Sequence, residues 1–228
     1  MTFHMLISVL NQKGGVGKTT LTVHLTGLLA DRGLNVAAID ADGQGATKDW
    51  LEQAMPETTC FFADEAEKIP EAVRILEPHV DAIVADGPPG LDAKTQSLLW
   101  HTDLAIVPTE PSLLDLKATA QALAIVSAIG ERREKGPIET VVVLNCFRTN
   151  SSVSEEAIEA FASLGVRLAR TTLGLRDALK RARQNNTIVT RMGYAAKAAA
   201  AEVTALFDEI LPASLLRADA AQETRRAA

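Results

Sequence analysis

Short apolar runs alternate with longer segments of helical spacing along most of the chain. The runs are rich in Val, Ile and Leu and lie at 5–10, 36–39, 82–85, 104–107 and 141–144. Runs that are apolar on both faces are typical of buried parallel strands. Helical spacing fills the segments 18–32, 112–133, 154–164 and the alanine-rich 194–211. This alternation predicts an α/β fold with a mostly parallel, twisted sheet flanked by helices.

The ends of the domain can be estimated from composition and local motifs. Ser112 followed by Asp115 resembles a capping box, so we expect a helix to begin there. A chain of 228 residues with 47% hydrophobic residues suits one core, and we expect a single domain over 1–212. The remaining segment, 213–228, shows no clear pattern and is expected to be a flexible or loosely helical tail.

Charge and cysteine content limit the class of protein. The net charge of -6 means that any DNA contact needs a local basic patch. Cys60 and Cys146 lie far apart without CxxC spacing, which is typical of buried thiols in a reducing compartment. No run of about 18 apolar residues could span a bilayer, and no basic leader precedes the first apolar run. We therefore expect a cytoplasmic protein and no membrane partner.

The segment KGGVGKTT directly follows the first apolar run and has the character of a phosphate-binding loop. Gly14, Gly15 and Gly17 allow the backbone to approach a phosphate closely. A helix that begins near Lys18 would direct its free N–H groups and its positive dipole end at the phosphates. Lys18 can reach the β- and γ-phosphates, and the Thr19 hydroxyl can ligate Mg²⁺. A glycine-rich turn with a solvated lysine is the alternative, and the surrounding strand, helix and acidic motifs argue against it.

The loop departs from the usual spacing GxxxxGK[ST], because Gln12 stands at the first glycine and Lys13 follows it. In this respect KGGVGKTT resembles the deviant Walker A motif of the ParA/MinD family. The resemblance covers about 5–211 and implies a three-layer P-loop NTPase that binds ATP with Mg²⁺. It also implies that Lys13 reaches across an ATP-sandwich homodimer to the phosphates of the other copy. The alternative is that Lys13 only adds local positive potential.

Two carboxylates, Asp40 and Asp42, follow the second apolar run. Carboxylates at the C-terminal ends of parallel strands face the ligand crevice, and residues two apart point the same way if the strand continues. The pattern is similar to the family's usual DxDPQG, with Gly43 in place of the proline. By this resemblance Asp42 positions the attacking water and Asp40 supports the metal shell. A loop of solvated acids is the alternative.

The third apolar run ends in Asp86, which is the form of a Walker B motif. Such a carboxylate holds Mg²⁺ through a water. The following Gly-Pro-Pro-Gly at 87–90 resembles the family's switch II, which is usually DxPP. Two prolines stiffen this segment and two glycines permit a turn, as suits a loop that responds to the γ-phosphate. The alternative is that Asp86 only caps the next helix.

Two weaker resemblances lie further along the chain. PTEPSLLDL at 108–116 resembles a proline-containing segment near the dimer interface of small partition ATPases. Asn145 matches a position that often contacts adenine, although an asparagine at a strand end is more often a turn former. The residues expected to bind nucleotide are Lys13, Gly14, Gly15, Val16, Gly17, Lys18, Thr19, Thr20, Asp42, Asp86 and Asn145. Within the whole site we expect Lys13, Lys18 and Asp42 to be catalytic and Thr19, Asp40 and Asp86 to face the metal.

A basic island lies between Arg167 and Arg191, where seven basic residues and one acid give a net charge of +6. Arg176, Lys180 and Arg183 fall at i, i+4 and i+7 and would form one helical stripe. The pattern suits phosphate contacts without sequence readout, whereas a solvated helix face is the plain alternative. The family resemblance favours nonspecific DNA binding. The residues expected to contact DNA are Arg170, Arg176, Lys180, Arg181, Arg183 and Arg191.

Together with the resemblance, these motifs predict first a small ParA-type partition ATPase. Such a protein binds ATP, dimerises on nonspecific nucleoid DNA, and is released when a centromere-binding adaptor similar to ParB or ParG stimulates hydrolysis. A positioning ATPase for a protein assembly or a DNA-transfer complex would share this biochemistry and stays open. A MinD-like membrane ATPase fits less well, because it would need a basic amphipathic C-terminal helix and the tail does not show that pattern. The absence of cysteine from 86–90 excludes a nitrogenase-reductase type.

Overall fold

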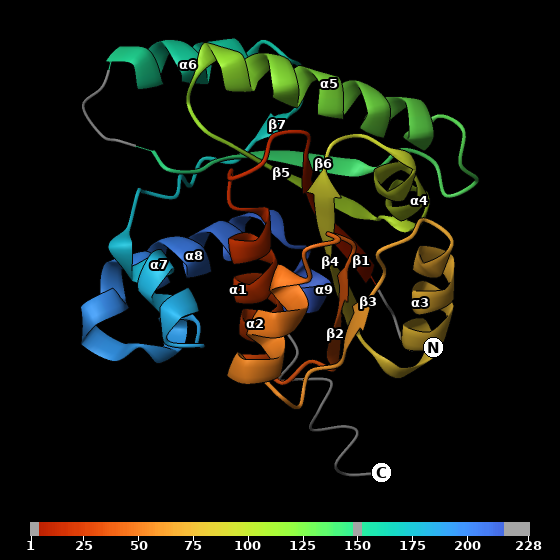
Figure 1. Ribbon diagram of the computed structural model, residues 1–228. Coiled ribbons are helices and arrows are strands. Elements are labelled where there is room, and N and C mark those ends of the chain that lie inside the picture. The colour runs from red at the N-terminus through yellow and green to blue at the C-terminus, as the bar shows by residue number, and fades with distance from the viewer. Residues whose placement is uncertain (1–4, 148–151, 217–228) are drawn as a thin grey trace.

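The structure, a computed structural model, describes residues 5–147 and 152–216. Within these ranges seven strands form one parallel sheet in the order β3-β2-β4-β1-β5-β6-β7 (Figure 1). The strands are β1 (Met5–Asn11), β2 (Val36–Asp40), β3 (Cys60–Phe62), β4 (Ala82–Pro89), β5 (Leu104–Thr109), β6 (Glu139–Leu144) and β7 (Arg167–Leu168). The first strand is therefore central, between β4 and β5, and every one of its residues is buried.

Helices cover both faces of the sheet, because alternate strand residues point to opposite sides. Ile7 and Val84 belong to an apolar layer shared with α1, α2 and α8. On the other face, Ile83 packs with α3, and Val142 packs with α5 and α6. Figure 1 shows these two helical layers with the sheet between them. The helices are α1 (Lys18–Asp31), α2 (Ala46–Ala54), α3 (Lys68–Leu76), α4 (Ala93–His101), α5 (Leu113–Gly130), α6 (Ser152–Ala162), α7 (Asp177–Gln184), α8 (Lys197–Ile210) and α9 (Ala213–Leu216), with 3₁₀ turns η1 (Glu77–His79), η2 (Val189–Arg191) and η3 (Gly193–Ala196).

The predicted three-layer α/β fold is confirmed, and all five apolar runs form strands. The sheet is parallel throughout its described strand pairs. β3 and β7 were not predicted, because they are the short edge strands of the sheet and lack the full burial that marks the central strands. The predicted cap of α5 is present, since the Ser112 side chain accepts a hydrogen bond of 3.1 Å from the amide of Asp115.

The predicted tail falls partly within the described residues. Its first part forms α9, and Leu215 there is buried in the core. The rest of the expected tail lies outside the described residues, so the proposed division of the chain stays a prediction. Across 5–147 and 152–216, no helix combines the length and the apolar content needed to cross a bilayer.

Candidate nucleotide-binding site

The phosphate loop, residues 12–17, connects β1 to α1 at the C-terminal edge of the sheet. Gly15 and Gly17 have φ angles of 80° and 96°, which residues with a side chain rarely adopt. Gly17 is also closely packed, since a Cβ atom there would lie 2.3 Å from Nδ2 of Asn145, whereas a Cβ at Gly14 would meet nothing within 4 Å. Position 17 therefore requires glycine, both for its positive φ angle and because Asn145 leaves no room for a side chain. The space around Gly14 is open.

Asn145, at the end of β6, holds the loop from behind. Its Nδ2 donates to the carbonyl oxygen of Val16 at 2.8 Å, and its Oδ1 accepts from the amide of Cys146 at 2.9 Å. Asn145 is buried. These bonds fix the side chain against the loop, and the predicted contact with adenine stays a prediction.

Lys18, the first residue of α1, lies under the loop. It is 7% exposed, and its Nζ donates to the main-chain oxygen of Lys13 at 3.0 Å. Burial lowers the pKa of Lys18, while the nearby Asp86 and Asp42 carboxylates act in the opposite direction. Because the ammonium group has three donors and this carbonyl takes one, Lys18 can bind an anion seated on the loop.

Asp86 is completely buried in β4 and accepts two side-chain hydrogen bonds on the same oxygen. Thr19 Oγ1 and Thr47 Oγ1 each donate to Asp86 Oδ2 at 2.6 Å. Burial raises the pKa of Asp86 to about 7. Its other oxygen, Oδ1, is buried without a hydrogen-bond partner. Thr47 is a site residue that the sequence analysis missed, since a lone threonine at a helix start gives no distinctive signal.

This arrangement fits Mg²⁺, which prefers oxygen ligands and keeps several of its waters. Asp86 supplies an unpaired carboxylate oxygen beside the Thr19 hydroxyl. The described ranges, this site included, contain no group of three or more His, Cys, Asp or Glu side chains that could hold a metal ion. A site made of one carboxylate, one hydroxyl, waters and nucleotide phosphates does not require such a group.

β2 ends at Asp40, so Asp42 lies beyond the strand. The alternation of a strand therefore does not make the two side chains point the same way. Asp40 is buried, and its two oxygens accept from the amides of Asp42 at 3.1 Å and Lys48 at 2.9 Å. Burial raises the pKa of Asp40. Asp42 is half-buried in the following loop and accepts from the amide of Gln44 at 3.1 Å. Asp40 thus shapes the loop that presents Asp42, and its predicted place in the metal shell stays a prediction.

The Lys13 ammonium is paired with two acids of the segment that follows β5. Its Nζ lies 2.8 Å from Oδ1 of Asp115 and 4.0 Å from Oε2 of Glu110. The hydrogen bond to Asp115 raises the pKa of Lys13. Asp115 is 1% exposed and also accepts a hydrogen bond from the Ser112 hydroxyl, whereas the neighbouring Leu114 is 83% exposed. Lys13, the first lysine of the motif, is therefore held by Asp115, and the residue before Asp115 is an exposed leucine.

The segment predicted to be switch II begins as a strand, because β4 extends through Pro89. A Cβ at Gly87 would come within 3.0 Å of the Val9 carbonyl oxygen, so glycine permits close packing against β1. The amide of Gly90 donates to the carbonyl oxygen of Gln12 at 3.1 Å. Gln12, which replaces the usual glycine, thereby connects the phosphate loop directly to this segment.

A cavity of about 490 Å³ extends from the phosphate loop toward α7. This volume lies within the range of about 300–1,000 Å³ that is typical of small-molecule sites. Trp50 of α2 forms part of its wall, and Arg183 lies 5.3 Å above the Trp50 ring. The cavity is lined by Gly15, Gly17, Thr19, Thr20, Trp50, Asn145, Cys146, Gly174, Leu175, Arg176, Leu179, Lys180, Arg183 and Gln184.

The basic island does not form one surface. Four of its arginines make ion pairs with acids from distant parts of the chain. The pairs are Arg167–Glu139, Arg170–Glu209, Arg176–Glu202 and Arg191–Asp31. Arg183 packs on Trp50 and lines the cavity beside the phosphate loop. Lys180 and Arg181 are exposed and have no ion-pair partner in the described part of the chain. Arg176, Lys180 and Arg183, which were predicted to form one helical stripe, line the same cavity, and their contact with DNA stays a prediction.

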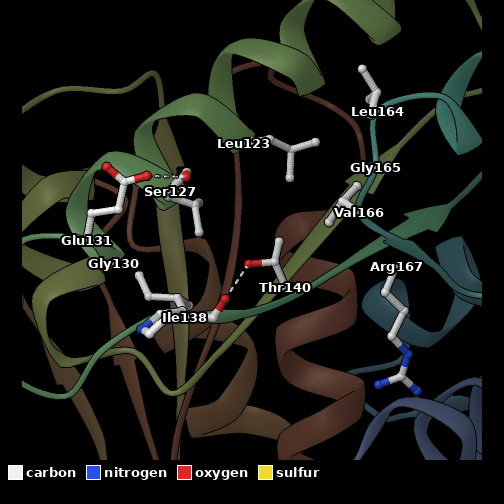
Figure 2. A pocket seen from close by; sticks show the side chains of 12 residues that line it. Leu123, Ser127, Gly130, Glu131, Ile138, Thr140, Leu164, Gly165, Val166 and Arg167 are labelled. Atoms are coloured by element: carbon white, nitrogen blue, oxygen red, sulfur yellow. Dashed lines mark hydrogen bonds between the residues drawn. The ribbon is translucent and has the colours of Figure 1, made fainter.

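A second cavity, of about 480 Å³, lies at the opposite edge of the sheet, where β6 and β7 begin (Figure 2). Figure 2 shows the side chain of Leu123 on its helical side, while Ser127 and Glu131 hydrogen-bond to each other within α5 at 3.3 Å. Glu131 and Arg167 are the charged residues that line it. Ligands of open α/β sheets bind at the carboxyl ends of the strands, so the nucleotide is expected at the first cavity.

Comparison with known proteins agrees with this assignment. Residues 7–189 match the family model described as the CobQ/CobB/MinD/ParA nucleotide binding domain. The chain is 29% identical, over 211 residues, to maintenance of carboxysome distribution protein A of Halothiobacillus neapolitanus. The matched region covers 90% of this chain and 96% of that protein.

Two solved structures share the fold. An ATP complex of a McdA variant from Cyanothece has a TM-score of 0.74 at 17% identity, over 92% of this chain and 97% of that chain. MinD of Pyrococcus horikoshii with Mg-ADP has a TM-score of 0.66 at 19% identity, over 88% of this chain and 94% of that chain. At these identities the likeness extends to the parallel seven-stranded P-loop architecture.

Proposed function

Because the chain belongs to the CobQ/CobB/MinD/ParA nucleotide-binding family, we propose that it is a positioning ATPase that distributes a large protein assembly within the cell. ATP hydrolysis is the reaction of the ParA/MinD ATPases. The cargo assignment rests on the relative that maintains carboxysome distribution, because that match extends over nearly both full lengths. The sequence analysis ranked DNA partition first and a protein assembly second, and this match reverses that order.

In the proposed reaction, the loop amides and the Lys18 ammonium bind the β- and γ-phosphates. Asp42, which is half-buried and near enough to Lys18 to act on its pKa, orients a water for attack on the γ-phosphorus. The bond from that phosphorus to the bridging oxygen of ADP breaks, and ADP and phosphate form. Catalysis of this kind depends mainly on positioning and on electrostatic stabilisation of the transferring group.

Asp86, through a water, and the Thr19 hydroxyl would hold Mg²⁺. When bound, the ion neutralises developing charge on the β- and γ-phosphate oxygens. Thr47 donates a hydrogen bond to Oδ2 of Asp86. This bond orients the carboxylate and leaves Oδ1 without a hydrogen-bond partner. Hydrogen-bonded outer partners of this kind commonly fix the orientation of metal ligands.

One observation supports a dimeric mechanism most directly, namely the position of Lys13. Its ammonium is paired with Asp115 at the surface and not with its own loop. A second copy that buries the exposed Leu114 could receive this lysine at its phosphates. A cation supplied in this way stabilises the transition state of phosphoryl transfer. In the proposed cycle ATP closes the dimer, the dimer binds nonspecific DNA, and a partner protein on the cargo stimulates hydrolysis and release.

The cargo can be tested in the source cell. Deletion of the gene should cluster a fluorescently labelled protein compartment and leave plasmid inheritance unchanged. Plasmid loss with normal compartment spacing would instead assign DNA partition. Purified protein should hydrolyse ATP and form a dimer with ATP but not with ADP. Sedimentation with anionic vesicles in the presence of ATP distinguishes a membrane-associated ATPase, which would cosediment.

A further inference from the structure

Lys13 is held through its main chain as well as through its ammonium group. Its amide donates to Oδ1 of Asn11 at 3.2 Å, and its carbonyl oxygen accepts from Nζ of Lys18 at 3.0 Å. Its ammonium lies 2.8 Å from Oδ1 of Asp115. The two main-chain bonds fix the peptide units on either side of Lys13, and so they set the direction of its Cα–Cβ bond.

Asn11 is the last residue of β1 and is 1% exposed. Its Nδ2 donates to the carbonyl oxygen of Pro108 in β5 at 2.7 Å. This side-chain bond lies beyond the last main-chain pair between the two strands, which joins Val9 to Ile106. An asparagine offers both an acceptor and a donor, and here each is used. Asn11 therefore connects the amide of Lys13 to the end of β5.

The acids that pair with Lys13 follow the same strand. β5 ends at Thr109, Glu110 comes directly after it, and Asp115 lies in the first turn of α5. Asn11 thus contacts both the main chain of Lys13 and the strand that leads into the acids paired with its ammonium. A change at Asn11 would alter the position of the lysine relative to these acids.

We propose that Asn11 is a positioning residue for ATP hydrolysis. It fixes the main chain of Lys13 so that the ammonium extends toward the face that carries Asp115 and, in the ATP dimer, reaches the nucleotide of the other copy. This inference rests on the proposed function, in which Lys13 acts on the other copy. Neither hydrogen bond of Asn11 involves the loop glycines or Lys18, which are proposed to bind the phosphates. Loss of Asn11 should therefore impair the site of the opposite copy and spare the site of its own chain.

A mixture of two variants tests in which copy Asn11 acts. Asn11→Ala should lower kcat by about tenfold, as expected for the loss of buried hydrogen bonds, and keep the Kd of a fluorescent ATP analogue near that of the wild type. Asp42→Ala should be inactive, because the carboxylate that orients the water is removed. In an equimolar mixture the Asp42→Ala copy supplies a correctly placed Lys13 to the intact site of the Asn11→Ala copy. Hydrolysis should therefore exceed the sum of the two variants measured separately, at a concentration at which the wild type is dimeric with ATP.

Lys13→Ala mixed with Asp42→Ala is the matched control, and it should regain hydrolysis in the same way. If this control stays inactive, Lys13 does not act on the other copy, and the proposed dimeric mechanism fails together with the role of Asn11. If the control regains hydrolysis and the Asn11→Ala mixture does not, Asn11 acts within its own site and the inference alone is overturned. Normal hydrolysis by Asn11→Ala measured by itself would also overturn it.

A double variant provides a second readout. Because Asn11 acts through Lys13, the protein with both Asn11→Ala and Lys13→Ala should hydrolyse ATP no more slowly than Lys13→Ala. A further loss of activity, or a raised Kd for ATP, would show that Asn11 only supports the loop. Asn145→Ala, which releases Val16 at the other end of the loop, is the reference for such damage. Thermal unfolding shows which variants are folded, and Asn11→Ser replaces Asn11→Ala in each comparison if the alanine variant is unfolded.

Discussion

The phosphate loop and the basic island are both contiguous in sequence, yet only the loop is contiguous as a site. In the loop, the backbone itself brings the functional groups together within a few residues, because a strand ends and a helix begins. In the island, neighbouring arginines form ion pairs with different acids and line different cavities, because other parts of the chain pack around them. A short motif built on backbone geometry can therefore be located from sequence, whereas a run of charge acquires its function only from what folds against it.

The largest expected effect tests the loop side of this comparison. Lys18→Ala should reduce ATP hydrolysis by at least about 10³-fold, because a buried cation at the phosphates is removed. Nucleotide affinity, measured by fluorescence titration, should also fall. Arg170→Ala is the control from the island, since Arg170 is 90% exposed and should leave both quantities unchanged. Normal hydrolysis by Lys18→Ala would remove the loop from the mechanism.

Lys13→Ala sharpens the comparison within the loop itself. It should lower hydrolysis by about 10²-fold and abolish the ATP-dependent dimer, while the Kd for ATP stays near that of the wild type. Asp115→Asn removes the ion pair that holds Lys13 and keeps the size of the side chain. It should therefore make dimerisation easier, as followed by light scattering with ATP. A Lys13→Ala protein that dimerises and hydrolyses normally contradicts the proposed role of Lys13.

His24 of α1 joins the helix that follows the phosphate loop to the segment of the basic island. Its burial leads us to expect that stability depends on pH. Its Nδ1 lies 2.7 Å from the Thr20 carbonyl oxygen, and its Nε2 accepts from the amide of Val189 at 3.2 Å. Burial lowers the pKa of His24 to about 4 from 6.5. The unfolded chain therefore binds the proton first, so the stability from the neutral ring is complete above pH 6.5 and is lost as the pH falls toward 4.

The expected loss is about 3 kcal/mol across that interval. It should be absent from His24→Gln, so the difference between the two proteins isolates the histidine from the carboxylates. Urea unfolding at pH 7, 6, 5 and 4 measures it. Parallel curves for the two proteins would show that His24 is not held neutral by the fold.

The smallest effect is expected for the island's ion pairs. Arg191 is paired with Asp31 at the surface, where both side chains are about one-third exposed. A double-mutant cycle with Arg191→Gln and Asp31→Asn should give a coupling of about 0.5 kcal/mol, as for other exposed pairs. Thermal unfolding in low and high salt provides the measurement, and the coupling should decrease with salt. A coupling several times larger would mean that the island is organised as tightly as the loop.

The fold and the phosphate loop could be predicted because their signals are local. Double-sided burial marks each central strand, and the glycine and lysine spacing marks the turn into α1. The sequence could not show that Thr47 bonds Asp86 or that Asp115 holds Lys13, because these contacts join elements through the sheet order. The same limit applies to the island, where the compensating glutamates lie on α8 and β6.

The strand order also has a consequence for synthesis of the chain. β1 is made first, yet its two partners are β4 and β5. At about 5–20 residues per second, roughly a hundred residues must be added before both sides of β1 can pair, a wait of about 5–20 s. Until β4 is made, β1 has no strand to pair with, and until β5 is made one side of β1 stays unpaired. Nascent chains stalled before β5 should therefore be protease-sensitive and depend on chaperones, and chains stalled well beyond β6 should be protected.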